Sequence, residues 1–215
     1  MAEEKPANPR RLGAILYDQF ELLDLYGPLE MFGTVPDVEI VTVAEQAGPV
    51  ASSAGPETLA RFSYDDAPAL DLLLLPGGIG TLPALGSDAM LSFLRDRVPR
   101  AELTMSVCTG SALLAKAGVL DGRRATSNKL FFQLAESQSE KVEWVHRARW
   151  VADGPFSTSS GVSAGTDMAL AMIARLFGRE QAERVALITE YEWQEDPDRD
   201  PFFEHLNQGD ASLMG

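Results

Sequence analysis

The residue with the clearest chemical potential is Cys108, the only cysteine among the 215 residues of the chain. The apolar residues 103–107 before it are typical of a short buried strand, and residues 112–117 after it are typical of a helix. A side chain at such a strand-to-helix turn stands on a strained bend, as in a nucleophile elbow. The N-terminus of the helix would direct unpaired N–H groups at the sulfur and favour the thiolate. We therefore predict a reactive thiol, against the alternative of a small buried apolar side chain.

Two further predicted strand ends carry residues that suit addition or acyl-transfer chemistry. The first strand leads to Asp24, and the third strand ends in Gly77 and Gly78. In open α/β sheets the site lies outside the carboxyl ends of the strands, so we expect these residues beside Cys108. Together they would supply a nucleophile, donors for an oxyanion and a carboxylate.

Each of these residues also has a plain structural reading. The N–H groups of Gly78 and Thr109 would face a developing negative charge, whereas a Gly-Gly pair alone is a tight turn. Asp24 beside the sulfur would stay protonated and act as an acid, or it would cap a helix. Glu21 and Glu30 are rival carboxylates at neighbouring positions.

The two histidines, His146 and His205, lack the spacing of a metal pair, and the chain has no CxxC motif. We therefore expect neither a metal site nor a cofactor. The net charge of −14 disfavours nucleic acid and anionic membranes as partners. The single cysteine cannot form an internal disulfide, and residues 1–11 lack the apolar core of a signal peptide, so we predict a cytoplasmic location.

Apolar runs alternate with helical patterns, which predicts βαβ units in a doubly wound, flavodoxin-like α/β fold. This fold has a mainly parallel sheet with helices on both faces. The predicted strands are residues 12–17, 38–44, 70–75, 103–107 and 124–126, followed by a hairpin of residues 144–151 and 156–159. The main predicted helices are residues 27–32, 87–98, 112–117, 161–177 and 179–188.

The length and the apolar fraction of 45% fit one well-filled core. We predict a flexible arm at residues 1–10, a single domain at residues 11–206 and a loose tail at residues 207–215. Residues 190–204 combine many acids with four aromatic side chains, so we expect this segment to pack across the domain or against a partner subunit.

The motifs in residues 24–28, 75–78 and 106–111 together resemble the ThiJ/PfpI superfamily, whose fold is that of class I glutamine amidotransferases. The resemblance runs from about residue 12 to residue 188, and its nearest branch is the isonitrile hydratase-like group. It implies that Cys108 is the nucleophile and Asp24 its carboxylate partner. It also implies a homodimer that takes a small-molecule substrate.

The resemblance further implies that Thr109 and Gly78 line the site, and two departures alter the expected pocket. Thr109 follows the cysteine where protease-like relatives place a histidine, so peptidase activity is not expected. Asn128 and Lys129 stand where many hydratase-like members carry a histidine. We therefore include Asn128, with Gly77 and Gly78, among the predicted substrate-binding or oxyanion-binding residues.

Three functions remain open at this point. The first is the hydration of an isocyanide to an N-substituted formamide, with Cys108 as nucleophile and Asp24 as proton shuttle. The second is a redox or stress role in which Cys108 is oxidised, together with a glyoxalase or deglycase activity. The third is a ligand-sensing module without a DNA-binding domain, since similar domains precede helix-turn-helix regions in some regulators.

Overall fold

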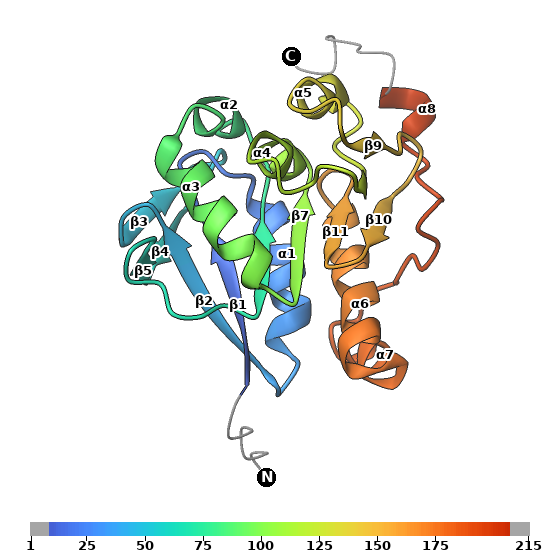
Figure 1. The fold of residues 1–215 in the computed structure, drawn as a ribbon. Coiled ribbons are helices and arrows are strands. Elements are labelled where there is room, and N and C mark those ends of the chain that lie inside the picture. The colour runs from blue at the N-terminus through green and yellow to red at the C-terminus, as the bar shows by residue number, and fades with distance from the viewer. Residues whose placement is uncertain (1–8, 207–215) are drawn as a thin grey trace.

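The computed structural model describes residues 9–206, which fold around a seven-stranded sheet (Figure 1). The strand order is β10-β11-β7-β6-β1-β2-β5, and all neighbours pair in parallel except the β10–β11 hairpin. In chain order these strands are β1 (Arg10–Ile15), β2 (Val38–Ala44), β5 (Phe62–Ser63), β6 (Leu72–Leu75), β7 (Leu103–Val107), β10 (Trp150–Asp153) and β11 (Phe156–Ser159). Two small sheets pair β3 (Gly48–Ala51) with β4 (Glu57–Ala60) and β8 (Arg124–Ala125) with β9 (Glu143–Trp144).

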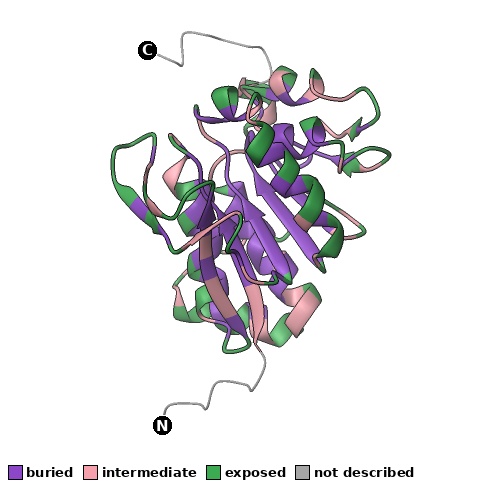
Figure 2. Ribbon diagram, turned by 60° about the vertical axis from the view of Figure 1, so that its left-hand side comes forward, coloured by how far each residue is buried: buried purple, intermediate pink, exposed green. Residues whose placement is uncertain are grey.

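Helices cover both faces of the main sheet, and Figure 2 shows the buried strands between more exposed helices. One layer holds α1 (Leu22–Gly33), α6 (Ala164–Phe177) and α7 (Arg179–Ile188), which pack on one another. The other layer, in front in Figure 1, holds α2 (Thr81–Ala84), α3 (Asp88–Arg97), a 3-10 turn (Val98–Arg100), α4 (Gly110–Lys116) and α5 (Phe132–Glu136). The short helix α8 (Phe203–Leu206) ends the described chain.

The central strands are apolar because they are covered on both faces. All four leucines of β6 are buried, and β6 lies between β1 and β7. The chain runs from β1 outward to β2 and later returns to place β6 on the other side of β1, so the strand order reverses at this pair. Ligands of open α/β sheets bind at such a switch point, outside the carboxyl ends of the strands. The residues after β1, β6 and β7 therefore share one edge.

The doubly wound, mainly parallel fold predicted from the sequence is confirmed, and several elements coincide with their predicted bounds. The strands at residues 38–44, 103–107 and 156–159 and the helix at residues 179–188 match. The turn at Asp153-Gly154 joins the antiparallel hairpin as expected.

Two predicted elements were wrong in position. Helix α1 begins at Leu22, five residues before the predicted start, so Asp24 lies in its first turn and Pro28 lies inside it. A proline is common at the first position of a helix, where its missing N–H is harmless, and this preference placed the predicted helix start next to Pro28. Of the strand predicted at residues 144–151, only its two ends are strands, and they belong to different sheets.

The predicted arm and tail lie largely outside the described residues. Arg10, assigned to the arm, is the first residue of β1, where it pairs with Val38 and forms an ion pair with Glu102. Between residues 9 and 206, no helix has the length and apolar character needed to cross a membrane.

Candidate active site

Cys108 lies directly after β7 in a left-handed backbone conformation with φ of +56°. This conformation is uncommon for a residue with a side chain, and the surrounding contacts hold it in place. The backbone N–H of Cys108 donates to the carbonyl of Ser159 at 3.2 Å. The hydroxyls of Ser111 and Ser127 both donate to the Cys108 carbonyl at 3.1 Å. The predicted elbow geometry is therefore present, and it is fixed from three sides.

Two glycines allow the loop after β6 to lie against this elbow. A methyl group on Gly77 would lie 2.6 Å from the Thr109 nitrogen and 2.9 Å from Cβ of Cys108. Gly78 has φ of +130°, and a methyl group there would lie 2.5 Å from the carbonyl oxygen of Gln19. Only glycine fits at these positions without moving the backbone.

Asp24 lies in the first turn of α1 and contacts both Gly77 and Cys108. It has no exposed surface, and its Oδ2 accepts a hydrogen bond from the Gly77 N–H at 2.9 Å. Its Oδ1 has no hydrogen-bond partner among the described residues. Burial raises the pKa of Asp24 to about 8, the charge of Glu21 adds to the rise, and the bonds from Gly77 and Cys108 oppose it. Asp24 is thus a carboxyl group that can hold a proton near neutral pH.

The thiol of Cys108 is also nearly enclosed, with 5% of its surface exposed. Burial raises its pKa well above the ordinary value, and the neighbouring Asp24 raises it further. Hydrogen bonds from Thr109 and Asn128 lower the pKa only in part. The N-terminus of the seven-residue helix α4 favours the thiolate, but the loss of hydration outweighs it.

Asn128 donates a hydrogen bond from its side-chain nitrogen to the Cys108 sulfur at 3.0 Å. Its side-chain oxygen accepts from the N–H groups of Leu130 at 2.9 Å and Phe131 at 3.1 Å. Because those two groups can only donate, they fix which end of the amide faces the sulfur. The structure thus places Asn128, a predicted site residue, against the Cys108 sulfur.

The Thr109 hydroxyl belongs to a chain of hydrogen bonds that leads away from the sulfur. It lies 2.8 Å from the Thr81 hydroxyl, which lies 3.0 Å from the Tyr17 hydroxyl, and Tyr17 donates to the Pro76 carbonyl at 2.7 Å. A carbonyl can only accept, so Tyr17 donates to Pro76. Thr81 must then donate to Tyr17, and each hydroxyl passes its proton one step toward Pro76. The Thr109 hydroxyl therefore donates to Thr81, and its oxygen accepts the Gly78 N–H at 3.1 Å.

This chain changes the predicted oxyanion site. The Gly78 N–H bonds to Thr109 and the Gly77 N–H bonds to Asp24, so neither is free in this conformation. The donors directed at the sulfur are instead the Thr109 N–H and the Asn128 amide. No sequence pattern pointed to Tyr17 and Thr81, because they meet Thr109 only through a contact between distant loops.

The remaining candidates lie elsewhere. Glu21 accepts from the Ser53 hydroxyl at 3.0 Å, and Glu30 is exposed, so Asp24 is the one of the three rival carboxylates that is buried against Gly77. Lys129 turns away from Cys108 into a buried ion pair with Asp200 at 3.6 Å.

The two histidines are not part of this arrangement. His146 bonds to Glu136 at 3.0 Å and stacks on Phe132 at 4.2 Å, and His205 lies in α8. Within the described part of the chain, no group of three His, Cys, Asp or Glu residues is placed to hold a metal ion.

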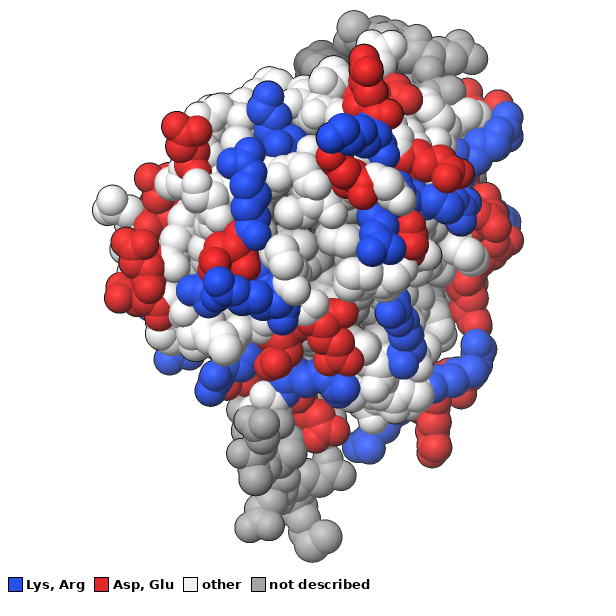
Figure 3. Space-filling view, viewed as in Figure 1, with Lys and Arg blue, Asp and Glu red and all other residues white. Residues whose placement is uncertain are grey.

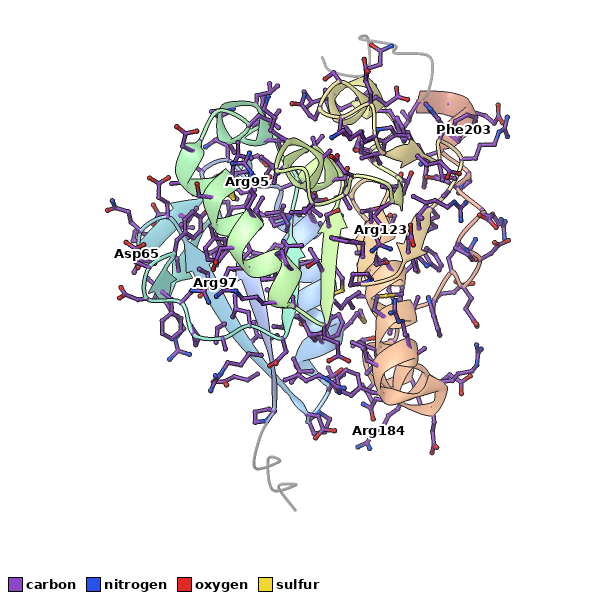
Figure 4. The ribbon with its side chains drawn as sticks, in the orientation of Figure 1. Asp65, Arg95, Arg97, Arg123, Arg184 and Phe203 are labelled. Atoms are coloured by element: carbon purple, nitrogen blue, oxygen red, sulfur yellow. The ribbon has the colours of Figure 1, made fainter. Side chains whose placement is uncertain are left out.

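The C-terminal segment packs across the domain in part, as predicted. Tyr191 donates to Asp167 at 3.1 Å, and Trp193 packs against the core, whereas Phe202 is 49% exposed. Figure 4 labels Phe203 on α8, where the Arg147 guanidinium lies 4.4 Å from the centre of its ring. The segment thus runs from the core to the surface near Figure 4's upper right edge.

Comparisons with known proteins agree with this geometry. Residues 10–175 match the DJ-1/PfpI family model. Isonitrile hydratase from Pseudomonas putida is 35% identical over 181 residues, which cover 84% of this chain and 78% of that protein. The HTH-type transcriptional regulator GbdR from Pseudomonas aeruginosa is 29% identical over 191 residues, and the match spans only 52% of that regulator. The crystal structure of a ThiJ/PfpI family protein from Pseudomonas syringae superposes with a TM-score of 0.81 at 32% identity, covering 100% of this chain and 92% of the other. The chain therefore belongs to the DJ-1/PfpI family.

Proposed function

We propose that this protein hydrates an isocyanide to an N-substituted formamide, with Cys108 as the nucleophile and Asp24 as the proton shuttle. The observation that carries the proposal is the pair of buried, titratable side chains, Asp24 and Cys108, that meet beside Gly77. The similarity to isonitrile hydratase across most of both chains supports the choice of substrate class. The overall reaction adds one water molecule to the isocyanide carbon and needs no electron donor or acceptor.

In the first step the Cys108 sulfur bonds to the terminal isocyanide carbon. Asp24 gives its proton to that carbon and takes the thiol proton, so the product is a neutral thioimidate. A carboxyl group whose pKa lies near 8 suits this exchange, because it can both lose and regain a proton near neutral pH. The Asn128 amide, 3.0 Å from the sulfur, would stabilise negative charge that develops there during the attack.

In the second step water attacks the thioimidate carbon. Asp24 moves a proton from the water to the imidate nitrogen, and the carbon–sulfur bond then breaks to release the formamide. The sulfur leaves with the hydroxyl proton of the tetrahedral intermediate, which restores the thiol. The Thr109 N–H would donate to the departing sulfur, while the Thr109 hydroxyl holds the loop through Gly78.

The test is formamide production from benzyl isocyanide, measured by chromatography for the wild type and for Cys108→Ala. We expect the substitution to abolish turnover, because no other group described near Asp24 can form the covalent intermediate. Asn128→Ala is the matched variant, since it leaves the thiol in place and removes one donor; we expect it to retain a measurable fraction of the rate. Turnover by Cys108→Ala above a few per cent of wild type contradicts the mechanism.

Oxidation of Cys108 is the second candidate, favoured by the two donors that face the sulfur. The Asn128 amide and the Thr109 N–H would bond to the oxygen of a sulfenic acid, formed with release of water from hydrogen peroxide. The raised thiol pKa and the burial of Cys108 argue for slow oxidation. Mass spectrometry after exposure to equimolar peroxide separates the two: oxidation within minutes, without isocyanide turnover, favours this candidate.

The predicted homodimer and cytoplasmic location stay predictions, as does the third hypothesis of a ligand-sensing module. Light scattering coupled to size-exclusion chromatography measures the first directly. A mass near twice 23.3 kDa would agree with a homodimer.

A further inference from the structure

A cavity of about 530 Å³ lies near the candidate active site and shares Tyr17 with it, and Cys108 is not among its lining residues. It opens at the carboxyl ends of β1 and β2, where the β3–β4 hairpin faces α2 and the start of α3, in the upper left of Figure 1. Cavities of this size at the carboxyl edge of an α/β sheet are typical ligand sites.

The walls of this cavity are tied together before any ligand arrives. The hairpin is held to the loop after β1 by bonds from Gln19 N–H to the Ala51 carbonyl and from Ser53 N–H to the Phe20 carbonyl, both 2.8 Å. The Tyr26 hydroxyl adds a bond to β4 at 2.7 Å. The cavity is therefore a formed feature of the fold.

The inner surface is apolar and aromatic. Tyr17 and Tyr64 line it together with Met90 and several aliphatic side chains. Tyr64 is stacked on Phe93 with ring centres 4.3 Å apart, and its hydroxyl donates to the Met90 sulfur at 3.3 Å. Ordered aromatic rings of this kind contact apolar groups and attract cations to their faces.

The charges that line the cavity are all negative. Asp18, Glu45 and Glu57 lie on the lining, and no lysine, arginine or histidine does. None of the three carboxylates forms an ion pair with any residue between 9 and 206. Figure 3 shows acidic side chains along the left edge of the molecule, over β3 to β5, and Figure 4 labels Asp65 at the same edge.

These carboxylates are not arranged for a metal ion. No cluster of three potential ligands exists in the described part of the chain. A hard divalent ion needs several oxygens within about 2.0–2.6 Å. Carboxylates spread around an apolar cavity instead match a cation whose charge is carried on an organic body.

We propose that this cavity binds a small organic cation, an alkylammonium or arylalkylammonium, whose apolar body packs on Tyr17, Tyr64 and Met90 and whose charge faces Asp18 and Glu45. The site is separate from the thiol and goes beyond the proposed hydration reaction. An organic cation would lower the mutual repulsion of the carboxylates while it covers apolar surface.

Isothermal titration calorimetry at fixed ionic strength tests this proposal with three probes of similar size: benzylammonium, benzyl alcohol and benzoate. We expect saturable binding of benzylammonium with a Kd of about 1 mM or below. Benzyl alcohol should bind at least about tenfold more weakly, and benzoate should not bind. Tetraethylammonium serves as a second cation of different shape.

The variants Asp18→Asn and Glu45→Gln should each weaken benzylammonium binding by roughly two- to fivefold. Asp65→Asn is the matched control, because it removes a charge from the same acidic edge without touching the cavity lining; we expect no change. Equal weakening by Asp65→Asn overturns the site, since it would reflect general attraction to an acidic surface. Equal binding of benzyl alcohol, or saturable binding of neither cation, also overturns it.

Discussion

Asp24 and Asp167 are both aspartates without exposed surface, one beside Cys108 and the other under the C-terminal segment. Asp167 receives two bonds from the Arg149 guanidinium, at 2.8 and 2.6 Å, and further bonds from Tyr191 and the Gln194 N–H. Asp24 receives a bond from the Gly77 N–H and one from the Cys108 thiol, and no cation is among the described groups that shift its pKa.

The contrast shows how one residue type serves two purposes. A buried carboxylate with a guanidinium and two further donors ties segments together, whereas a buried carboxyl without a cation beside it keeps a proton that it can transfer. Lys129 and Asp200 repeat the paired arrangement where the C-terminal segment crosses the domain. We therefore assign the buried pairs to stability and the unpaired carboxyl to chemistry.

Replacing Asp24 by Asn should give the largest effect. It tests whether the buried carboxyl without a cation serves catalysis rather than stability. The amide oxygen can still accept from the Gly77 N–H, so the fold should remain intact. The proton shuttle is lost, and we expect isocyanide turnover to fall by about 10²- to 10⁴-fold. Steady-state rates with a parallel urea titration measure both quantities. A variant with near wild-type turnover would remove Asp24 from the mechanism.

Replacing Asp167 by Asn should act in the opposite way. It leaves the Arg149 charge buried without its partner, so the free energy of unfolding should fall by about 3–5 kcal/mol. Turnover per folded molecule should change little, because Asp167 has no contact with Cys108 among its hydrogen bonds.

Glu183→Gln is the control for this variant, since Glu183 forms an exposed pair with Arg179. It should cost less than about 1 kcal/mol. Equal destabilisation by the two substitutions would show that burial of the Arg149–Asp167 pair does not determine its effect on stability. Urea unfolding at pH 7 distinguishes the outcomes.

Asp24 and the buried, paired Lys129 should make the free energy of unfolding change with pH in opposite directions. The pKa of Asp24 is about 8 in the folded protein against 3.8 ordinarily, so between these values the folded state holds a proton that the unfolded chain has lost. The free energy of unfolding therefore falls with rising pH in that window, by up to about 1.4 kcal/mol per unit. Lys129, whose pKa burial lowers from 10.5 to about 8, makes stability rise between these two values.

Urea titrations from pH 5 to pH 9 test both signs, because above pH 9.0 the raised pKa of Cys108 makes the free energy of unfolding fall again. Wild-type stability should pass through a minimum near pH 8. Asp24→Asn should lose the falling limb, and Lys129→Met should lose the rising limb. A falling limb that persists in Asp24→Asn would assign the slope to other groups.

The sequence predicted those features of the site that depend on short stretches of chain. The buried leucines of β6 and the strand–cysteine–helix order around Cys108 are local patterns, and they placed the elbow correctly. The start of α1 was missed because Pro28 normally marks a first turn, while here tertiary packing keeps it inside the helix. The rise in the pKa of Cys108 has no local signal in the sequence, because burial arises only when distant segments close over Cys108.

The smallest expected effect concerns the hydrogen-bond chain from Thr109 through Thr81 to Tyr17. Tyr17→Phe removes the last hydroxyl, so the Thr81 proton loses its acceptor and the Thr109 hydroxyl is held less firmly. We expect a loss of about 1 kcal/mol in stability and a fall of less than about tenfold in kcat, with KM unchanged. Tyr26→Phe is the matched control, because it removes a hydroxyl bond of 2.7 Å to Thr58 in β4, outside the chain. A drop in kcat confined to Tyr17→Phe identifies Tyr17 as a positioning residue that acts through Thr109, whereas equal drops in both variants reduce its role to general stability.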